Sequence, residues 1–241
     1  MVRAVLFDYG LTLVSFDYPR EELLRVLAEV RPWLGPRAPS PEWLMREVLE
    51  PLEEGLEAFG GQDDQEVDYL DFYEAAWRRA GLDVPRKTLW RILDLEQRRW
   101  DRSVRLAPDA LETLAALRGR GLRLGIASNA PFPPAMLHRQ LRVNGLERAV
   151  DAAVFSSEVG RRKPAPELYR AALDRLRVAP SEALYVGDKP GEDYEGPRRL
   201  GMHAVLCAAL ARRPAPDGVP AVARLGELPA YVARIDAWVA P

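Results

Sequence analysis

Three short apolar runs of this sequence are each followed by polar side chains that could do chemistry. These side chains are Asp8 with Thr12, Ser128 with Asn129, and Asp188 with Asp193. Clustered carboxylates repel one another and destabilise a fold unless a cation or a proton lies between them. Mg²⁺ is a hard ion that binds oxygen and is usually held by one or two carboxylates. If the fold brings Asp8, Asp188 and Asp193 together, the sequence therefore predicts a divalent-metal site.

The apolar runs themselves have the length and composition of buried strands. They are residues 5–7, 122–127, 152–155 and 183–186. Each is too short for a helix and most lack polar alternation, which is typical of strands covered on both faces. Stretches with helical periodicity lie between them, so the strands should be parallel and joined by right-handed crossovers. The pattern predicts a doubly wound, Rossmann-like α/β fold, in which ligands bind outside the carboxyl ends of the strands.

The same alternation continues to the C-terminus. Helices are expected at residues 109–118, 133–141, 166–176, 193–200 and 227–239, a fifth strand at 203–206, and a proline-rich surface loop at 212–220. Lys163 lies just ahead of one of these helices, where it could approach the polar residues at the strand ends.

Residues 15–103 interrupt the alternation. They contain no convincing buried strand but four amphipathic helical stretches, at residues 20–30, 41–59, 68–80 and 87–100. We therefore predict an α/β core formed by residues 1–14 and 104–241, with residues 15–103 inserted as a helical cap. Aromatic residues of such a bundle mostly fill its core. The candidates to shape a pocket instead are Trp33, Trp43, Phe59, Phe72 and Trp77.

Composition limits the partners and the compartment. The chain has 34 basic and 36 acidic residues and a net charge of -2, so no positive field is present to hold a nucleic acid. One cysteine, Cys207, rules out an internal disulfide and suits a reducing compartment. No apolar run approaches the 18 or so residues that a membrane span needs. We expect a cytoplasmic protein that does not bind membranes; the sequence leaves its oligomeric state open.

The polar residues also match a known family in their order along the chain. Residues 7–13, then Ser128-Asn129, then Lys163-Pro164, then Gly187-Asp188 with Asp193 resemble the four motifs of the haloacid dehalogenase-like hydrolase superfamily. The helical insertion after the first motif resembles the subgroup whose cap lies at that position. The resemblance spans nearly the whole chain and is specific for the fold and the site, but not for the substrate.

The resemblance implies a Mg²⁺-dependent hydrolysis of small-molecule phosphate esters. Asp8 would attack phosphorus and form an aspartyl-phosphate, which water then hydrolyses. Ser128, Asn129 and Thr12 would contact the phosphate, and Lys163 would neutralise charge on Asp8 and on the transferred group. The Mg²⁺ would be held by Asp8, the backbone carbonyl of Gly10 and Asp188. Asp193 would hold the water shell of the metal or orient Lys163.

The chain departs from the family pattern at two positions. Gly10 stands where phosphatases of the superfamily usually carry a second Asp, which protonates the leaving oxygen and then activates water. Loss of such a group costs on the order of 10²- to 10⁴-fold in rate. Leu11 stands where the family usually has glycine, and we expect Gly10 to supply the backbone freedom instead.

The missing Asp leaves three functional hypotheses open. The first is a phosphatase whose proton transfer comes from a cap carboxylate, the substrate or water. The second is a dehalogenase-like or phosphonatase-like hydrolase. Asp188 and Asp193 oppose the departure of a halide, and the phosphonatase would need Lys87, the only lysine of the insertion, as a Schiff base. The third is a binding module with weak turnover.

Overall fold

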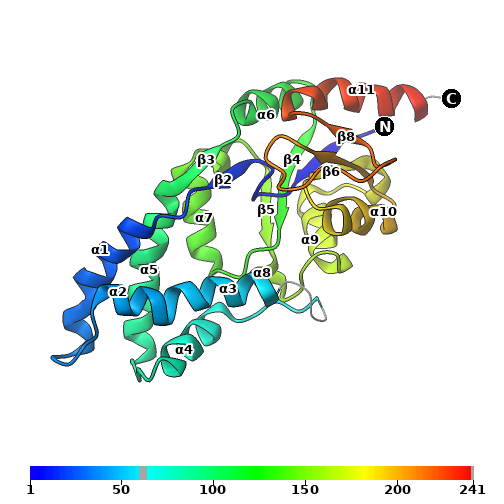
Figure 1. Cartoon of the computed structure of the whole chain (residues 1–241). Coiled ribbons are helices and arrows are strands. Elements are labelled where there is room, and N and C mark those ends of the chain that lie inside the picture. Colours follow the sequence, from blue (N-terminus) through cyan, green and yellow to red (C-terminus); the bar gives the residue numbers. More distant parts are fainter. Residues whose placement is uncertain (60–63, 240–241) are drawn as a thin grey trace.

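A six-stranded parallel sheet forms the centre of the structure (Figure 1). The computed structural model describes residues 1–59 and 64–239. The strands of this sheet are β1 (Ala4–Phe7), β4 (Arg123–Ser128), β5 (Ala152–Phe155), β6 (Ala183–Gly187), β7 (His203–Cys207) and β8 (Ala221–Val222). Their order is β5-β4-β1-β6-β7-β8, and all neighbouring pairs are parallel. The predicted doubly wound α/β fold is confirmed; β8 is a two-residue edge strand that the sequence did not predict.

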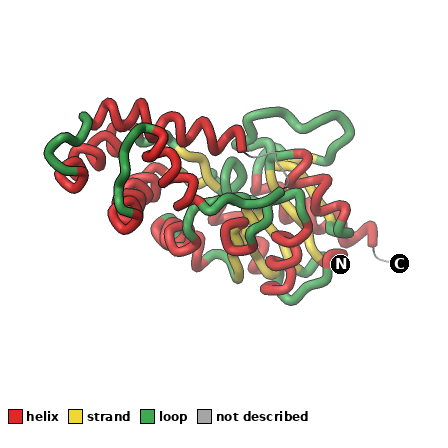
Figure 2. The backbone as a smooth tube through the Cα atoms, turned by 90° about the horizontal axis from the view of Figure 1, so that it is seen from below, coloured by secondary structure: helices red, strands yellow, loops and turns green. Residues whose placement is uncertain are grey.

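Side chains of β1 alternate between the two faces of the sheet, and helices cover both faces (Figure 2). Val5 and Phe7 belong to an apolar cluster with α6 (Ala110–Gly119), α7 (Pro134–Val143) and α11 (Leu228–Val239). Ala4 and Leu6 belong to a cluster with α9 (Pro166–Leu176) on the opposite face. Because both faces are covered, all four residues of β1 are buried, and the strand reads as a continuous apolar run.

Two short helices complete the covering of the sheet. They are α8 (Ser156–Val159) and α10 (Gly196–Arg199). The helix predicted at 193–200 differs from the observed one, because α10 is preceded by a π-helical turn, Pro190–Glu195, in which Asp193 lies.

The inserted residues form a helical unit (residues 20–103) with its own apolar core. Its helices are α1 (Arg20–Val30), α2 (Pro41–Leu44), α3 (Glu50–Phe59), α4 (Tyr69–Arg79) and α5 (Arg86–Ser103), and a π-helical turn, Met45–Leu49, joins α2 to α3. Leu27, Met45 and Ile92 are fully buried in this core together with Trp77. Among the described residues, no helix has both the length and the apolar character that crossing a membrane requires.

Two short strands join the helical unit to the sheet domain. They are β2 (Val14–Phe16) and β3 (Val104–Leu106), which pair antiparallel where the chain leaves the core and returns to it. The sequence analysis did not find them, because three residues are too few to show a strand period. The division into residues 1–14, 15–103 and 104–241 remains a prediction.

A second contact between the helical unit and the core lies far from these strands in the sequence. The backbone N–H of Glu66 donates to the carbonyl of Gly160 (3.1 Å), and that of Arg162 donates to Asp64 (2.8 Å). The Glu66 carboxylate is almost fully buried and accepts from Nη1 of Arg162 at 2.9 Å and from the Ser156 hydroxyl. This contact, which we call the Glu66 clasp, ties the helical unit to the residue that precedes Lys163.

One carboxyl group is buried in the core of the helical unit. Glu96 of α5 is 4% exposed and accepts a hydrogen bond from the Tyr73 hydroxyl at 2.9 Å. Burial raises the pKa of Glu96 to about 8, and the nearby Glu53 adds to the rise. The folded protein therefore keeps a proton on Glu96 at pH values where the unfolded chain has already released it.

We expect Glu96→Gln to change how stability depends on pH. The folded pKa of Glu96 is raised, so the loss of stability that Glu96 causes is absent below the ordinary glutamate pKa, grows as pH rises toward about 8, and is constant above that. Wild-type stability should fall by roughly 2 kcal/mol between pH 6 and pH 9 relative to Glu96→Gln, which keeps the acceptor for Tyr73. Urea unfolding at both pH values tests this, with the exposed Glu54→Gln as control. Equal pH slopes for wild type and Glu96→Gln would contradict the raised pKa.

Candidate active site

The strand order places three polar strand ends side by side. β1 lies between β4 and β6 in the sheet, with Phe7 level with Ile126 on one side and Val186 on the other. Asp8 follows β1, Ser128 ends β4, and Asp188 follows β6. The carboxyl edge of the sheet therefore carries the residues that the sequence analysis selected.

Three carboxylates meet at this edge. Asp8, Asp188 and Asp193 each offer an oxygen, and these oxygens lie within 4.8 Å of one another. Asp8 and Asp193 are buried, and Oδ1 of Asp188 is buried without a hydrogen-bond partner among the described residues. A buried acceptor without a partner, beside two further carboxylates, fits a cation or a shared proton. The cluster could hold a divalent metal ion.

Burial and mutual repulsion make these carboxyl groups hard to ionise without a cation. Burial raises the pKa of Asp188 to about 7, and the charges of Asp8 and Asp193 raise it further. Burial also raises the pKa of Asp193 to about 6, against the opposing attraction of Lys163.

Asp193 has most of its hydrogen-bonding capacity committed within the protein. Its Oδ1 accepts from Nζ of Lys163 at 2.7 Å. Its Oδ2 accepts from the backbone N–H groups of Asp188 (2.9 Å) and Lys189 (2.8 Å). Gly187 makes room for it, because a methyl group at that position would lie 2.3 Å from its carboxyl carbon. Asp193 thus holds both Lys163 and the loop of Asp188, and its role at the site remains a prediction.

Lys163 supplies the positive charge of the cluster. Its ammonium is fully buried and lies 3.0 Å from Oδ1 of Asp8 and 2.7 Å from Asp193. It also donates to the hydroxyl of Tyr185 at 2.9 Å. Burial works against the charged form, but the attraction of Asp193 and Asp8 keeps the pKa of Lys163 well above its ordinary value. The lysine is therefore charged at neutral pH.

Asn129 holds the backbone of Lys163 in place. The Asn129 amide accepts from the Lys163 N–H at 2.7 Å and donates to the Lys163 carbonyl at 3.0 Å. It also donates to the carboxylate of Glu192 at 3.1 Å. The side chain of Asn129 is therefore engaged with the protein, and its contact with a phosphate, implied by the resemblance, remains a prediction.

Thr12 and Ser128 are both buried. Thr12 lies close to Asp8 along the chain, and Ser128 lies on the strand next to the one that Asp8 follows. Thr12 is 0% exposed, and its hydroxyl has no hydrogen-bond partner among the described residues. Ser128 is the last residue of β4, adjacent to β1. A buried hydroxyl without a partner is costly unless a ligand completes it.

The loop after Asp8 corrects one expectation of the sequence analysis. The left-handed backbone conformation belongs to Leu11, at φ 56°, and Gly10 has no positive φ. Gly10 therefore does not supply the freedom that we expected of it. The strained conformation of Leu11 is held by the turn, in which its N–H donates to the Val14 carbonyl at 2.7 Å.

Position 10 is covered by an aromatic ring. A methyl group built at Gly10 would lie 3.3 Å from Cε2 of Phe16, on β2. Phe16 in turn packs edge-on against Tyr9, with ring centroids 5.9 Å apart. A longer side chain at position 10 would have to displace the Phe16 ring, which is 39% exposed.

The aromatic pocket candidates divide once the packing is known. Trp77 is fully buried in the core of the helical unit, and Phe72 and Trp43 pack against that core. Trp33 lies against Arg91, whose guanidinium is 4.1 Å from the ring centre. The side chain of Phe59 lies outside the described residues. Trp77 thus fills the core, as most aromatic residues of a helical bundle do.

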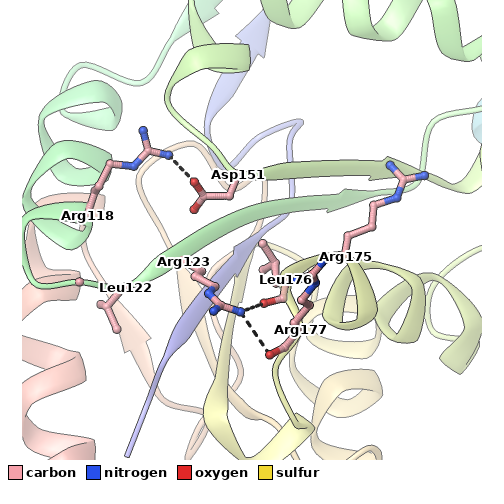
Figure 3. A pocket seen from close by; sticks show the side chains of 8 residues that line it. Arg118, Leu122, Arg123, Asp151, Arg175, Leu176 and Arg177 are labelled. Atoms are coloured by element: carbon pink, nitrogen blue, oxygen red, sulfur yellow. Dashed lines mark hydrogen bonds and ion pairs between the residues drawn. The ribbon is translucent and has the colours of Figure 1, made fainter.

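An arginine-rich recess of about 520 Å³ lies at the opposite edge of the sheet (Figure 3). It is formed where α6 and α9 end and β4 begins. Arg123 donates there to the carbonyls of Leu176 and Arg177, and Arg118 donates to Asp151 at 3.0 Å. These guanidinium groups cap carbonyls at the end of a helix and pair with a carboxylate, so they stabilise the fold and do not form a second centre of chemistry.

Sheet and site together define an α/β protein whose reactive groups are a carboxylate cluster and a buried lysine at the carboxyl edge. The family model of haloacid dehalogenase-like hydrolases matches residues 2–201. The chain belongs to the haloacid dehalogenase-like hydrolase family, and it is a hydrolase.

Relatives with assigned activities cover most of the chain. It is 33% identical over 212 residues to a phosphoserine phosphatase of Thermus thermophilus, covering 87% of this chain and 80% of the relative. It is 29% identical over 205 residues to a glyceraldehyde 3-phosphate phosphatase of Methanopyrus kandleri, covering 85% and 83%. The structure of a 2-haloacid dehalogenase from Pseudomonas syringae has the same fold, with a TM-score of 0.73 and 24% identity over 98% of this chain and 100% of that one.

Sequence reasoning missed Tyr185, Glu192 and Phe16 as neighbours of the site. Tyr185 lies inside a predicted buried strand, so its position in the sequence indicates a core residue. Its phenol within an aliphatic run is the one feature of the sequence that could have suggested a polar contact. Glu192 and Phe16 reach the site through a π-helical turn and a three-residue strand. Neither element has a sequence period that could have placed them.

We expect Mg²⁺ and Asp188→Asn each to raise stability by relieving the repulsion among the carboxylates, and Asp188→Asn to weaken the effect of Mg²⁺. Without metal, Asp188→Asn should be more stable than wild type above pH 7, because it removes a carboxylate whose pKa is raised to about 7 by burial and repulsion. Added Mg²⁺ should stabilise the wild type by about 2.7 kcal/mol at a hundred times its dissociation constant, and the variant much less. Thermal unfolding with Mg²⁺ and with chelator measures both effects.

The control for this measurement is Asp217→Asn, in an exposed loop. It should respond to Mg²⁺ as the wild type does. If Mg²⁺ does not stabilise the wild type at any pH between 7 and 9, the assignment of a metal site to this cluster is wrong.

Proposed function

We propose that this hydrolase is a Mg²⁺-dependent phosphatase of small-molecule phosphate esters, which forms an aspartyl-phosphate on Asp8. The observation that carries the proposal is the pairing of Asp8 with the buried Lys163 at 3.0 Å, inside a carboxylate cluster that fits a cation. The printed names of two relatives, a phosphoserine phosphatase and a glyceraldehyde 3-phosphate phosphatase, support phosphate esters as the substrate class.

Asp8 acts as the nucleophile in this proposal. One of its oxygens accepts from the backbone N–H of Tyr9 at 2.9 Å, which fixes the orientation of the carboxylate. A carboxylate that attacks phosphorus displaces the alcohol and becomes a phosphate anhydride; water then attacks phosphorus and regenerates Asp8. Lys163 neutralises the charge that gathers on the transferred phosphoryl oxygens. Thr12 and Ser128 donate hydroxyl hydrogen bonds to the same oxygens.

Asp8, Asp188 and the Gly10 carbonyl would hold the Mg²⁺, with Asp193 behind them. When bound, the ion supplies positive charge to the phosphoryl group and orients it. Asp193 supports the site from the protein side, because it fixes Lys163 and the Asp188 loop at once.

The helical unit serves as the cap that excludes water and selects the substrate. It reaches the core at β2 and β3 and again at the Glu66 clasp, beside the Arg162-Lys163 segment. These two tethers support the proposal that residues 15–103 act as a cap for the site.

Two other chemistries have less support. Asp188 and Asp193 place negative charge beside Asp8, which opposes the departure of a halide. Lys87, the lysine that a phosphonatase-like Schiff base would need, is exposed in the first turn of α5, at the end of that helix far from β3 (Figure 1). The third hypothesis, a binding module with weak turnover, would be supported by a folded protein that hydrolyses phosphate esters very slowly or not at all.

Turnover of an aryl phosphate with Mg²⁺ should depend on Asp8. An aryl alcohol departs with little need for a proton, so it is the substrate that best tolerates Gly10. We expect Asp8→Asn to reduce kcat by about a thousandfold or more, because the amide cannot act as nucleophile. Phosphate release from 4-nitrophenyl phosphate and from a panel of alkyl phosphates tests this. A folded wild type that releases phosphate from none of them, or equal rates in Asp8→Asn, would refute the proposal.

Restoring an acid at position 10 should require room. Gly10→Asp alone would push against the Phe16 ring, whereas Gly10→Asp with Phe16→Ala would let the carboxyl group adopt its preferred rotamer. We expect the double variant to raise alkyl phosphate turnover by roughly 10- to 100-fold over Gly10→Asp, which reaches at most the lower end of the effect of a positioned general acid. Phe16→Ala alone serves as control. A gain equal in Gly10→Asp and the double variant would mean that the ring moves freely.

A further inference from the structure

The hydroxyl of Tyr185 is the one uncharged group among the three that surround the Lys163 ammonium. Lys163 donates hydrogen bonds to Tyr185 Oη (2.9 Å) and to Asp193 Oδ1 (2.7 Å), and Asp8 Oδ1 lies 3.0 Å away as an ion pair. An ammonium has three N–H groups. Asp193 and Tyr185 engage two of them, and the third remains available to Asp8, whose contact with the ammonium at 3.0 Å is an ion pair without hydrogen-bond geometry.

The direction of the hydrogen bond at Tyr185 is fixed by its second partner. A tyrosine hydroxyl has one proton, and Tyr185 donates it to the carbonyl of Ala127, which can only accept. Tyr185 must therefore accept from Lys163. Hydrogen bonds that run in series polarise one another, so the Ala127 carbonyl strengthens Tyr185 as an acceptor.

Tyr185 stands on a rigid part of the fold. It lies in β6, between β1 and β7, and is 0% exposed. Its ring packs edge-on against Tyr169, with centroids 5.4 Å apart. Ala127, the acceptor of its proton, immediately precedes Ser128 on β4. The Tyr185 hydroxyl thus links the Lys163 ammonium to two strands of the sheet, β6 and β4. Side chains held by rigid elements keep the geometry of a site precise.

We propose that Tyr185 is a positioning residue that fixes the rotation of the Lys163 ammonium, so that its remaining N–H faces Asp8 and the transferred phosphoryl group. This role rests on the proposed phosphatase function. When Asp8 bonds to phosphorus it loses its charge, and the N–H that faced it can donate to a phosphoryl oxygen while Tyr185 and Asp193 hold the other two. Without Tyr185 the ammonium can turn, and that N–H is no longer directed.

The test compares Tyr185→Phe with wild type in kcat, KM and inhibition. Phenylalanine keeps the buried ring and removes the hydroxyl. A hydrogen bond to a charged group corresponds to roughly a 10- to 100-fold change, and we expect kcat on 4-nitrophenyl phosphate to fall by that factor with KM nearly unchanged. Orthovanadate, which mimics the five-coordinate transition state, should bind more weakly by the same factor, while inhibition by inorganic phosphate changes little.

The matched control is Tyr73→Phe. Tyr73 is also fully buried and donates its hydroxyl, to Glu96 in the core of the helical unit. It should lose stability as Tyr185→Phe does and keep the wild-type kcat. If Tyr185→Phe does not fold, Tyr185→Met replaces it, because methionine fills irregular space, and the same loss in kcat is expected.

The outcomes separate the two proposals. Wild-type kcat and vanadate affinity in folded Tyr185→Phe would show that the hydroxyl only satisfies the core, and the positioning role would be wrong. Equal weakening of vanadate and phosphate would also overturn it, because that is general loss of the site. A wild type that neither turns over phosphate esters nor binds vanadate would refute the phosphatase function itself, and the role of Tyr185 with it.

Discussion

The structure around the site is governed by the need to keep three carboxyl groups and one ammonium together at a largely buried edge of the sheet. Asp8, Asp188 and Asp193 each place an oxygen within 4.8 Å of the others, and Lys163 is the single buried cation among the described residues that pairs with them. One positive charge cannot offset three negative ones in a medium of low dielectric constant. Two features reduce the imbalance. Backbone N–H groups donate to Asp193, and Oδ1 of Asp188, which has no hydrogen-bond partner among the described residues, suits a metal ion.

Neutral groups hold the charged ones in place. Tyr185 and the amide of Asn129 bind Lys163 at its ammonium and at its backbone, so the lysine is fixed at both ends. A buried lysine side chain loses much rotamer entropy, and fixed partners of this kind recover part of that cost through charge-assisted hydrogen bonds. Each partner comes from a parallel strand or the segment that follows one, which keeps the geometry independent of the surface loops.

The departures from the family pattern are accommodated locally. Leu11 adopts the left-handed conformation that a glycine would take more easily, and the turn hydrogen bond to Val14 holds it there. Phe16 fills the space beside Gly10, so the absence of a side chain at that position is matched by an apolar ring from the helical unit's own entry strand. The departures at Gly10 and Leu11 are therefore compatible with the observed arrangement of the carboxylates and Lys163.

The sequence by itself determined the sheet and its polar edge. Strands buried on both faces must be apolar throughout, and parallel strands must end at one edge, so the residues after β1, β4 and β6 could be named from the chain. The family followed from those same residues. Only the tertiary structure decided which groups contact Lys163. Its ammonium donates to Asp193 and to the Tyr185 hydroxyl, and its backbone N–H donates to Asn129. Such contacts depend on distances across strands and on π-helical turns, which have no sequence period. Three further features could not be predicted for the same reason: the left-handed conformation of Leu11, the Phe16 ring beside Gly10, and the Glu66 clasp. Each arises from contacts between segments that are too short to show a periodic pattern in the sequence.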